Sequence, residues 1–293
     1  MEPLNALPKY NLFGLDEIGY DKAKVVVLPI PYDSTLTYRT GARNGPKAII
    51  DASRNLELYS YELGEDISKM GIYTTDEIAP NLGSPEKTVE EIKKEVGIVL
   101  DDGKLPLILG GEHTVSIGAV QAFKDRGEEI SIIHFDAHSD SRDELYGSKY
   151  MHATVMARIF EMYDKSVSVG VRSIDSDSAK KFSKKIIFMD EVHRQGIEKT
   201  AKKIIDATGK EVYITIDLDV LDPSEMPSVG TPEPDGLHYA ELVEMLKAIL
   251  GMKRLRGFDI VELNPIPYFS APDFLAAKLA YLTLGFAKGK SKL

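Results

Sequence analysis

Short, almost entirely apolar runs recur along the chain, and they limit its fold more than any other feature. They lie at residues 24–30, 105–111, 130–136, 166–171, 185–190, 212–219 and 256–263. Each run has the length of one strand, and a strand that is apolar on both faces needs cover on both sides. Segments with helical periodicity lie between the runs, at 85–102, 196–209, 239–250 and 271–286. The pattern predicts an α/β fold in which a mainly parallel sheet lies between two layers of helices.

The chain shows no sign of division into separate units. No Gly/Ser-rich or Pro-rich linker interrupts the 293 residues, and 43% of them are hydrophobic, which is enough for a large core. We expect a single three-layer α/β/α domain over residues 1–293, with residues 1–20 as a peripheral extension.

Charge and composition narrow the class of partner. A formal net charge of −10 argues against a nucleic-acid or anionic-membrane partner and favours a small cationic substrate. The chain has no cysteine, which excludes disulfides, thiolate metal ligands and cysteine nucleophiles. There is no basic leader with an apolar run, and no stretch approaches the ~18 apolar residues of a membrane span. We therefore expect a cytoplasmic enzyme.

Acidic and imidazole side chains gather where the apolar runs end. In parallel α/β sheets ligands bind beyond the carboxyl ends of the strands, so these positions are candidates for a site. Four runs are followed in this way, and the residues concerned are His113, then Asp136, His138 and Asp140, then Asp217 and Asp219, and finally Glu262.

The chemistry of these residues indicates metal ions. Side chains alternate along an extended chain, so Asp136, His138 and Asp140 should point the same way, as should Asp217 and Asp219. Four unpaired aspartates at the edge of a core would repel one another and lose several kcal/mol each in desolvation. Oxygen and nitrogen ligands without sulfur suit manganese, magnesium, iron or zinc. Two dications would balance the charge and, about 3.5 to 4 Å apart, would turn a shared water into hydroxide near neutral pH.

Each residue taken alone has a simpler interpretation. An aspartate after a strand, such as Asp136 or Asp219, is most often a helix cap or turn former. His134 is expected to be a packed core residue on the face opposite Asp136. The combination of alternating Asp and His after several strands is what favours the metal site.

Five motifs together resemble the ureohydrolase superfamily of arginases and agmatinases. They are GGEHT at 110–114, DAHSD at 136–140, DLDVLDP at 217–223, GTPEPDGL at 230–237 and DIVELNP at 259–265. The resemblance implies an eight-stranded parallel sheet, two Mn²⁺ ions per subunit, assembly as a homo-oligomer (a trimer or hexamer) and hydrolysis of a guanidinium group to urea and an amine. By resemblance, one ion would be held by His113, Asp136, Asp140 and Asp217, and the other by Asp136, His138, Asp217 and Asp219, with Asp136 and Asp217 as bridges.

The resemblance also implies roles in catalysis. A hydroxide between the metals would attack the guanidinium carbon, and Asp219 would accept its proton and pass it to the leaving amine. Glu262 would pair with the substrate guanidinium; the alternative is an exposed strand-end carboxylate. His152 would line the substrate entrance and relay protons; the alternative is a helix-start histidine, since Ala153 follows it where arginases have glycine.

Two further positions are candidates for substrate contacts. Thr231 lies in the GTPEPDGL loop, where Asp235 stands in place of the glycine of many relatives. Asp175 matches the position where arginases hold the distal amine, but an ordinary turn aspartate is an equal alternative. Glu112 is expected to support the site or to pack, and the remaining histidines, His193 and His238, are expected at the surface.

The substrate prediction is agmatine, hydrolysed to putrescine and urea in polyamine biosynthesis. Asp143 and Glu144 follow the DAHSD motif, and two acids would favour a free amine over a carboxylate by roughly 1 kcal/mol or less per exposed charge. Arg142 is the counter-argument, because facing inward it would bind a carboxylate and favour arginine or 4-guanidinobutyrate. Another amidinohydrolase is therefore the alternative within the enzyme class. A metal-stabilised scaffold or regulatory subunit without turnover is the alternative outside it.

Overall fold

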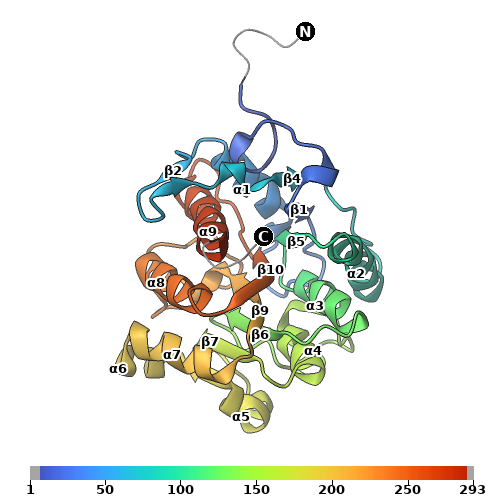
Figure 1. The fold of residues 1–293 in the computed structure, drawn as a ribbon. Helices are drawn as coiled ribbons and strands as arrows, with labels where there is room; N and C mark the ends of the chain where they lie inside the picture. Colours follow the sequence, from blue (N-terminus) through green and yellow to red (C-terminus); the bar gives the residue numbers. More distant parts are fainter. Residues whose placement is uncertain (1–6, 289–293) are drawn as a thin grey trace.

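A computed structural model describes residues 7–288, and its central feature is one eight-stranded parallel sheet (Figure 1). The strand order is β4-β1-β5-β10-β9-β6-β7-β8, and every neighbouring pair runs parallel. The strands are β1 Val25–Ile30, β4 Ile72–Thr74, β5 Leu105–Gly110, β6 Ser131–Phe135, β7 Val167–Val171, β8 Ile186–Phe188, β9 Glu211–Asp217 and β10 Arg254–Val261. The short strands β2 Tyr59–Ser60 and β3 Glu65–Asp66 pair with each other outside this sheet.

Helices cover both faces of the sheet, so the predicted three-layer α/β fold is confirmed. Two separate apolar clusters are buried, one on each face. Figure 1 shows α2, α3 and α4 on one side and α1, α7, α8 and α9 on the other. The helices are α1 Gly45–Ser53, α2 Pro85–Asp101, α3 Val115–Asp125, α4 Val155–Met162, α5 Ser176–Phe182, α6 Met189–Gln195, α7 Ile197–Ala207, α8 Tyr239–Leu250 and α9 Ala271–Lys288.

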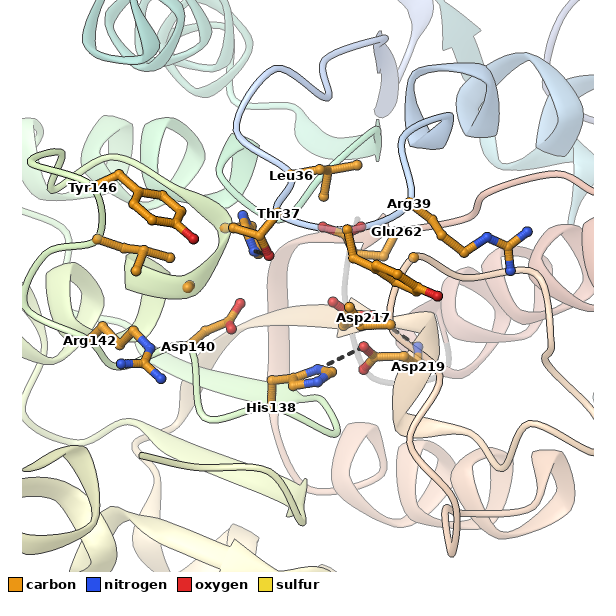
Figure 2. Close-up of a pocket in the computed structure, with 16 residues that line it drawn as sticks. Leu36, Thr37, Arg39, His138, Asp140, Arg142, Tyr146, Asp217, Asp219 and Glu262 are labelled. Atoms are coloured by element: carbon orange, nitrogen blue, oxygen red, sulfur yellow. Dashed lines mark hydrogen bonds and ion pairs between the residues drawn. The ribbon is translucent and has the colours of Figure 1, made fainter. Parts of the chain in front are cut away.

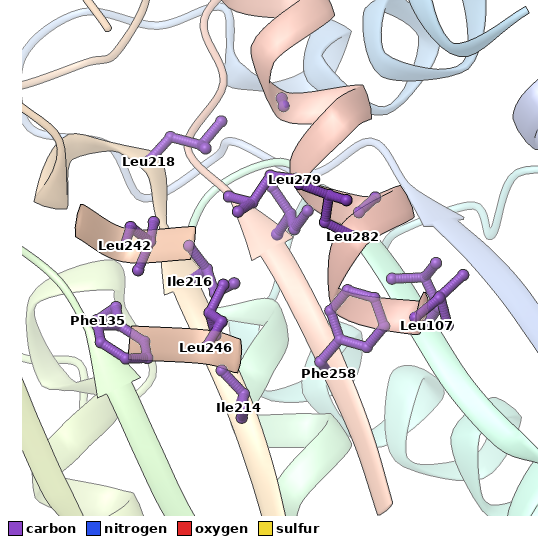
Figure 3. Close-up of a cluster of buried hydrophobic side chains, with 14 of the residues drawn as sticks. Leu107, Phe135, Ile214, Ile216, Leu218, Leu242, Leu246, Phe258, Leu279 and Leu282 are labelled. Atoms are coloured by element: carbon purple, nitrogen blue, oxygen red, sulfur yellow. The ribbon is translucent and has the colours of Figure 1, made fainter. Parts of the chain in front are cut away.

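The larger cluster shows how the sheet and helices interlock (Figure 3). Leucines 242 and 246 of α8 and leucines 279 and 282 of α9 lie over the side chains of the central strands. Ile214 and Ile216 of β9 and Phe258 of β10 meet them from the sheet, and all three are fully buried. Each fully buried aliphatic or aromatic side chain contributes about 1.5–3 kcal/mol, so this packing holds the strand ends in place.

Three differences from the expected elements have local causes. The edge strand β4 has only three residues, too few to register as an apolar run. The run at 185–190 was expected to be a strand throughout, but β8 ends at Phe188 and α6 begins at Met189. Helix α3 escaped detection because almost all of its residues are buried, which removes the polar stripe that marks a surface helix.

The segment before β1 is partly outside the described residues, since residues 1–6 are not included. Within it, Leu12 and Phe13 are buried in the core, and the Phe13 ring meets Tyr281 of α9 edge-on with 5.1 Å between centroids. These two residues pack into the core and do not lie at the periphery. Among residues 7–288, no helix combines the length and apolar character that crossing a membrane requires.

The ends of β1, β5 and β10 converge at Gly111, two residues before His113. The Gly111 N–H donates to the Ile30 carbonyl at 2.9 Å, and the Gly111 carbonyl accepts from the Glu262 N–H at 2.7 Å. A Cβ atom at this position would lie 2.0 Å from the Tyr32 carbonyl oxygen. Only glycine allows the backbone at residue 111 to lie this close to Tyr32, and this close approach positions His113 at the end of β5.

Gly111→Ala should therefore lower the free energy of unfolding by about 1–3 kcal/mol or more, because backbone atoms have to move to admit the methyl group. Gly19→Ala is the matched control: its φ is −64° and a Cβ there meets nothing within 4 Å. Urea unfolding followed by circular dichroism measures both. Equal stability of the two variants would contradict the close approach.

Candidate active site

A cavity of about 390 Å³ opens at the carboxyl ends of the central strands (Figure 2). Buried acids lie at its base, among them Asp217 from the end of β9 and Glu262 from the end of β10. Its mouth is formed by exposed side chains, and those of Tyr38 and Tyr146 are 73% and 84% accessible. The cavity thus leads from an aromatic rim to an acidic floor.

The floor contains a first cluster of donor atoms around His113. Its Nδ1 lies 3.2 Å from Asp136 Oδ2, 3.2 Å from Asp217 Oδ2 and 3.5 Å from Asp140 Oδ2. Donor atoms that are each about 2.1 Å from one common ion are separated by such distances. The four side chains therefore fit a divalent cation, and they come from three different strand ends.

A second cluster adjoins the first through the same aspartate. Asp136 Oδ1 lies 3.6 Å from His138 Nδ1, which lies 2.9 Å from Asp219 Oδ2. The two oxygens of Asp136 thus face different clusters, as a carboxylate that bridges two ions requires. For Asp217, one oxygen faces His113 and the other accepts the Asp219 N–H at 2.9 Å. The bridging role of Asp217 stays a prediction.

The protonation of the clusters reflects their burial and their excess of acids. Burial, followed by repulsion from neighbouring carboxylates, raises the pKa of Asp140 and of Asp217 well above the ordinary range. Burial alone would lower the pKa of His113, but hydrogen bonds and attraction from Asp136 and Asp217 outweigh it and raise that pKa. These shifts show that the clusters carry an excess of negative charge, which a divalent cation would offset.

The loops, and not strand alternation, bring these residues together. Strand β6 ends at Phe135, and Asp140 has the left-handed φ of 42°. Likewise Asp219 lies in a 3-10 turn, Leu218–Val220, after β9. The Ala137 N–H donates to Asp219 Oδ1 at 3.0 Å and joins the two loops. The expected convergence of the side chains is present, although the extended geometry assumed for it is not.

His134 corrects another expectation. It was predicted to pack on the face opposite Asp136, but its Nε2 lies 2.8 Å from Asp136 Oδ2. The prediction was wrong because residues two apart on a strand share a face. His134 is fully buried, so the expectation of burial was correct while the expected side was not.

Glu262 is buried rather than exposed. It is 6% accessible, lines the cavity, and adopts a left-handed φ of 68°. Its Oε1 accepts the His113 N–H at 2.7 Å. Burial, followed by repulsion from Asp217 and Glu112, raises the pKa of Glu262 well above the ordinary value. This placement removes the alternative of an exposed strand-end carboxylate.

His152 and Thr231 both line the cavity. His152 opens the 3-10 turn that precedes α4, and its Nε2 lies 3.4 Å from Thr37 Oγ1. Burial lowers the pKa of His152 to about 4, so its ring is neutral at physiological pH. Thr231 is exposed. In the same loop, Asp235 takes the left-handed φ of 66° that a glycine would adopt, so the turn is preserved.

Asp175 is a helix cap. Its Oδ1 accepts the N–H groups of Asp177 and Ser178, both at 3.1 Å, at the start of α5. It lies beside the main cavity, in a recess of about 160 Å³ that also touches His138 and Asp140. Its Oδ2 is 3.9 Å from Arg142 Nε, so a role in substrate binding requires Arg142 to give way.

The charged side chains at the rim of the cavity are not those that the sequence predicted. Asp143 pairs with Arg158 at 2.8 Å and Lys149 at 3.6 Å, and neither Asp143 nor Glu144 is among the residues that line the main cavity. The argument that these two acids attract an amine is therefore wrong. Arg142 does line the cavity, which is the orientation that would bind a carboxylate.

Sequence reasoning missed the loop after β1 and one supporting arginine. Leu36, Tyr38 and Arg39 line the cavity, and the rule that ligands bind beyond the strand ends would have indicated them. Arg172 donates to the carbonyls of Asp219 at 2.7 Å and of residues 233 and 234 at 2.9 Å, which ties two site loops together. No sequence signal marks an arginine whose partners are backbone carbonyls.

The surface histidines and Glu112 lie as expected. His193 and His238 are exposed, and each pairs with a nearby acid. Glu112 is fully buried and accepts hydrogen bonds from the N–H and hydroxyl of Thr35 at 3.0 and 2.7 Å. It supports the loop that forms one wall of the cavity.

A parallel sheet between helical layers, with aspartates and histidines clustered beyond its strand ends, defines an α/β enzyme with a candidate binuclear metal centre. The chain belongs to the arginase family: the model described as "Arginase family" matches residues 23–285. The resemblance read from the motifs is thereby confirmed, and so is the expectation of a hydrolytic enzyme of the ureohydrolase type.

Relatives of known description cover nearly the whole chain. It is similar to "N(1)-aminopropylagmatine ureohydrolase" of Thermus thermophilus, with 40% identity over 94% of each chain. It is 33% identical to "Agmatinase" of Pyrococcus horikoshii over 93% of this chain and 95% of that one. The crystal structure of agmatine ureohydrolase of Thermoplasma volcanium matches with a TM-score of 0.85 and 34% identity, over 92% of each chain.

Asp136→Ala should abolish binding of both ions, because its two oxygens face both clusters, whereas Asp140→Ala should weaken one ion. Activity of Asp136→Ala should fall by more than about 100-fold, the upper range for residues that only orient a ligand. Metal content after manganese loading and dialysis, measured by mass spectrometry, checks this. Asp190→Ala, on the exposed part of α6, is the control. Two ions retained in Asp136→Ala would contradict the bridge.

Proposed function

We propose that the chain hydrolyses the guanidinium group of agmatine to urea and putrescine, with two Mn²⁺ ions as cofactors. The ions would be held by His113, Asp136, His138, Asp140, Asp217 and Asp219. The observation that carries the proposal is the division of the Asp136 oxygens between two imidazole-containing clusters on the floor of one cavity. Membership of the arginase family and the names of the relatives support it.

The reaction replaces one C–N bond of the guanidinium group with a C–O bond. When bound, two divalent cations lower the pKa of a shared water so that a nucleophile is available near neutral pH. Glu262 orients the substrate: its Oε1 accepts the His113 N–H, and its Oε2 is left to accept from the guanidinium group.

Proton transfer completes the reaction. Asp219 lines the cavity, and its Oδ2 lies on the side of His138, so Asp219 accepts the proton that the attacking water loses. That proton passes to the amine nitrogen as its bond to the guanidinium carbon breaks, which releases urea and putrescine. His152 lines the cavity with a ring whose pKa is lowered by burial to about 4, and we propose that it contacts the substrate as a neutral imidazole and relays protons at the entrance.

Two alternative substrates have specific support. The name of the Thermus relative supports N(1)-aminopropylagmatine, whose extended cationic tail would reach the aromatic rim, where Tyr38 and Tyr146 offer cation–π contacts. Arg142 at the cavity wall supports a carboxylate-bearing substrate, arginine or 4-guanidinobutyrate. Thr231 and Asp175 are the proposed contacts for the substrate tail.

Urea release should be measured with agmatine, N(1)-aminopropylagmatine, arginine and 4-guanidinobutyrate on protein loaded with manganese, cobalt or iron. We expect the highest kcat/KM for the two carboxylate-free amines and with manganese. A preference for arginine or guanidinobutyrate would reject the agmatine assignment and spare the metal mechanism. Metal-loaded protein that hydrolyses none of the four would favour a non-catalytic scaffold.

The Arg142→Ala variant distinguishes a cationic substrate tail from a carboxylate tail, because KM should change in opposite directions for the two. Removal of a cation from the wall should lower KM for agmatine by up to about fivefold, since an exposed charge contributes about 1 kcal/mol or less. The same change should raise KM for 4-guanidinobutyrate if that compound binds. Lys149→Ala removes a nearby cation that does not line the cavity and is the matched control. A rise in KM for agmatine would contradict the proposed orientation.

The proposal includes a homo-oligomeric, cytoplasmic enzyme, as the family resemblance and the composition suggested. Size-exclusion chromatography with light scattering tests the assembly, for which a trimer or hexamer is expected.

A further inference from the structure

Four polar side chains form a row across the sheet, one layer below the clusters. In the strand register Asp259 of β10 is opposite Thr215 of β9, Thr215 is opposite His134 of β6, and His134 is opposite Ser168 of β7. All four are fully buried. Four adjacent polar residues in the middle of a buried sheet carry a desolvation cost that apolar residues would avoid. The contacts of these four residues indicate why polar side chains are present at these positions.

The row touches the clusters at two points. Thr215 Oγ1 lies 2.8 Å from His113 Nε2, and His134 Nε2 lies 2.8 Å from Asp136 Oδ2. The ring nitrogen of His113 that faces away from the carboxylates therefore has a partner of its own. In proteins such partners orient histidines that bind metals.

The hydrogen-bond directions at Thr215 follow from its neighbours. Its hydroxyl has one hydrogen, which is donated to Asp259 Oδ1 at 2.6 Å. Towards His113 the hydroxyl oxygen can then only accept, so Nε2 must carry a proton. The lone pair of the neutral ring is consequently on Nδ1, the nitrogen that faces Asp136, Asp140 and Asp217.

We propose that Asp259 and Thr215 are positioning residues that fix His113 in the orientation and tautomer needed to bind a metal ion. The inference rests on the proposed metal centre and extends it to two residues outside the clusters. Asp259 directs the hydroxyl of Thr215, and Thr215 directs the ring of His113. Neither residue touches the substrate or the reacting atoms.

Thr215→Val tests the proposal, because it removes the hydroxyl and keeps the branched shape. Titration calorimetry with Mn²⁺ on the metal-free proteins should show an affinity about 10- to 100-fold weaker for one of the two ions. Thr215→Ser, which restores the hydroxyl, should recover most of this loss. The kcat of Thr215→Val should approach the wild-type value once manganese is saturating, because the change acts on metal binding.

Tyr213→Phe is the matched control, because the Tyr213 hydroxyl donates to the other oxygen of Asp259 at 2.7 Å without reaching His113. It should weaken the core to a similar degree, measured by urea unfolding of the metal-free protein, and leave manganese affinity within about twofold of wild type, below the smallest effect of a ligand-orienting residue. Equal losses of affinity in Tyr213→Phe and Thr215→Val would overturn the proposal, as would wild-type affinity in Thr215→Val.

Asp259→Asn supplies a second test should Thr215→Val fail to fold. The amide offers one acceptor oxygen where the carboxylate offers two to the hydroxyls of Tyr213 and Thr215, so the free energy of unfolding should fall modestly, and manganese affinity should fall because the hydroxyl of Thr215 is no longer directed. Unchanged affinity in this variant would overturn the inference. If the wild-type protein bound no manganese, the proposed metal centre itself would be refuted. Wild-type protein that binds two ions without hydrolysing a guanidino compound would refute only the activity.

Discussion

The shared carboxylate of Asp136 is the contact on which the rest of the site depends. One of its oxygens faces His113 and the other faces His138, so two clusters are joined by a single side chain. The strand ends that carry these residues are held by apolar packing on both faces of the sheet. The sheet thus brings four buried aspartates within reach of one another, and nearby positive charge would relieve their mutual repulsion. The way in which the sheet is built therefore creates a site that is electrostatically suited to cations.

Hydrogen bonds from backbone N–H groups offset part of the repulsion among the buried carboxylates. Asp219 accepts from Ala137, Asp217 from Asp219, and Glu262 from His113. Two positions that line the cavity, Asp140 and Glu262, hold left-handed backbone conformations that cost about 1–3 kcal/mol each in residues other than glycine. Such strain persists only where surrounding structure enforces it. The loops therefore place the carboxylates more rigidly than a solvent-exposed turn would.

The sequence predicts those parts of the structure that come from a pattern repeated along the chain. The apolar runs repeat, so seven strands and the three-layer arrangement followed from them, while β4, with only three residues, did not. The convergence of His113, Asp136 and Asp217 followed from the rule that parallel strands end at one edge. The side occupied by His134 required only correct counting along the strand. The rim was unpredictable for a physical reason: whether Asp143 faces the cavity depends on its pairing with Arg158, a contact between residues of no common pattern.

The class of reaction and the choice of substrate therefore depend on residues at different depths of the cavity. In the proposed function every guanidino compound presents the same planar cation to Glu262, and burial in a low-dielectric floor would make that pairing strong and specific. The tails differ only where they meet Arg142, Tyr38 and Tyr146, which are half-buried or exposed, and exposed charges contribute about 1 kcal/mol or less each. A few rim substitutions therefore suffice to move such an enzyme from one tail to another without disturbing the floor. On this proposal, such a separation would account for one family with members named for different guanidino substrates.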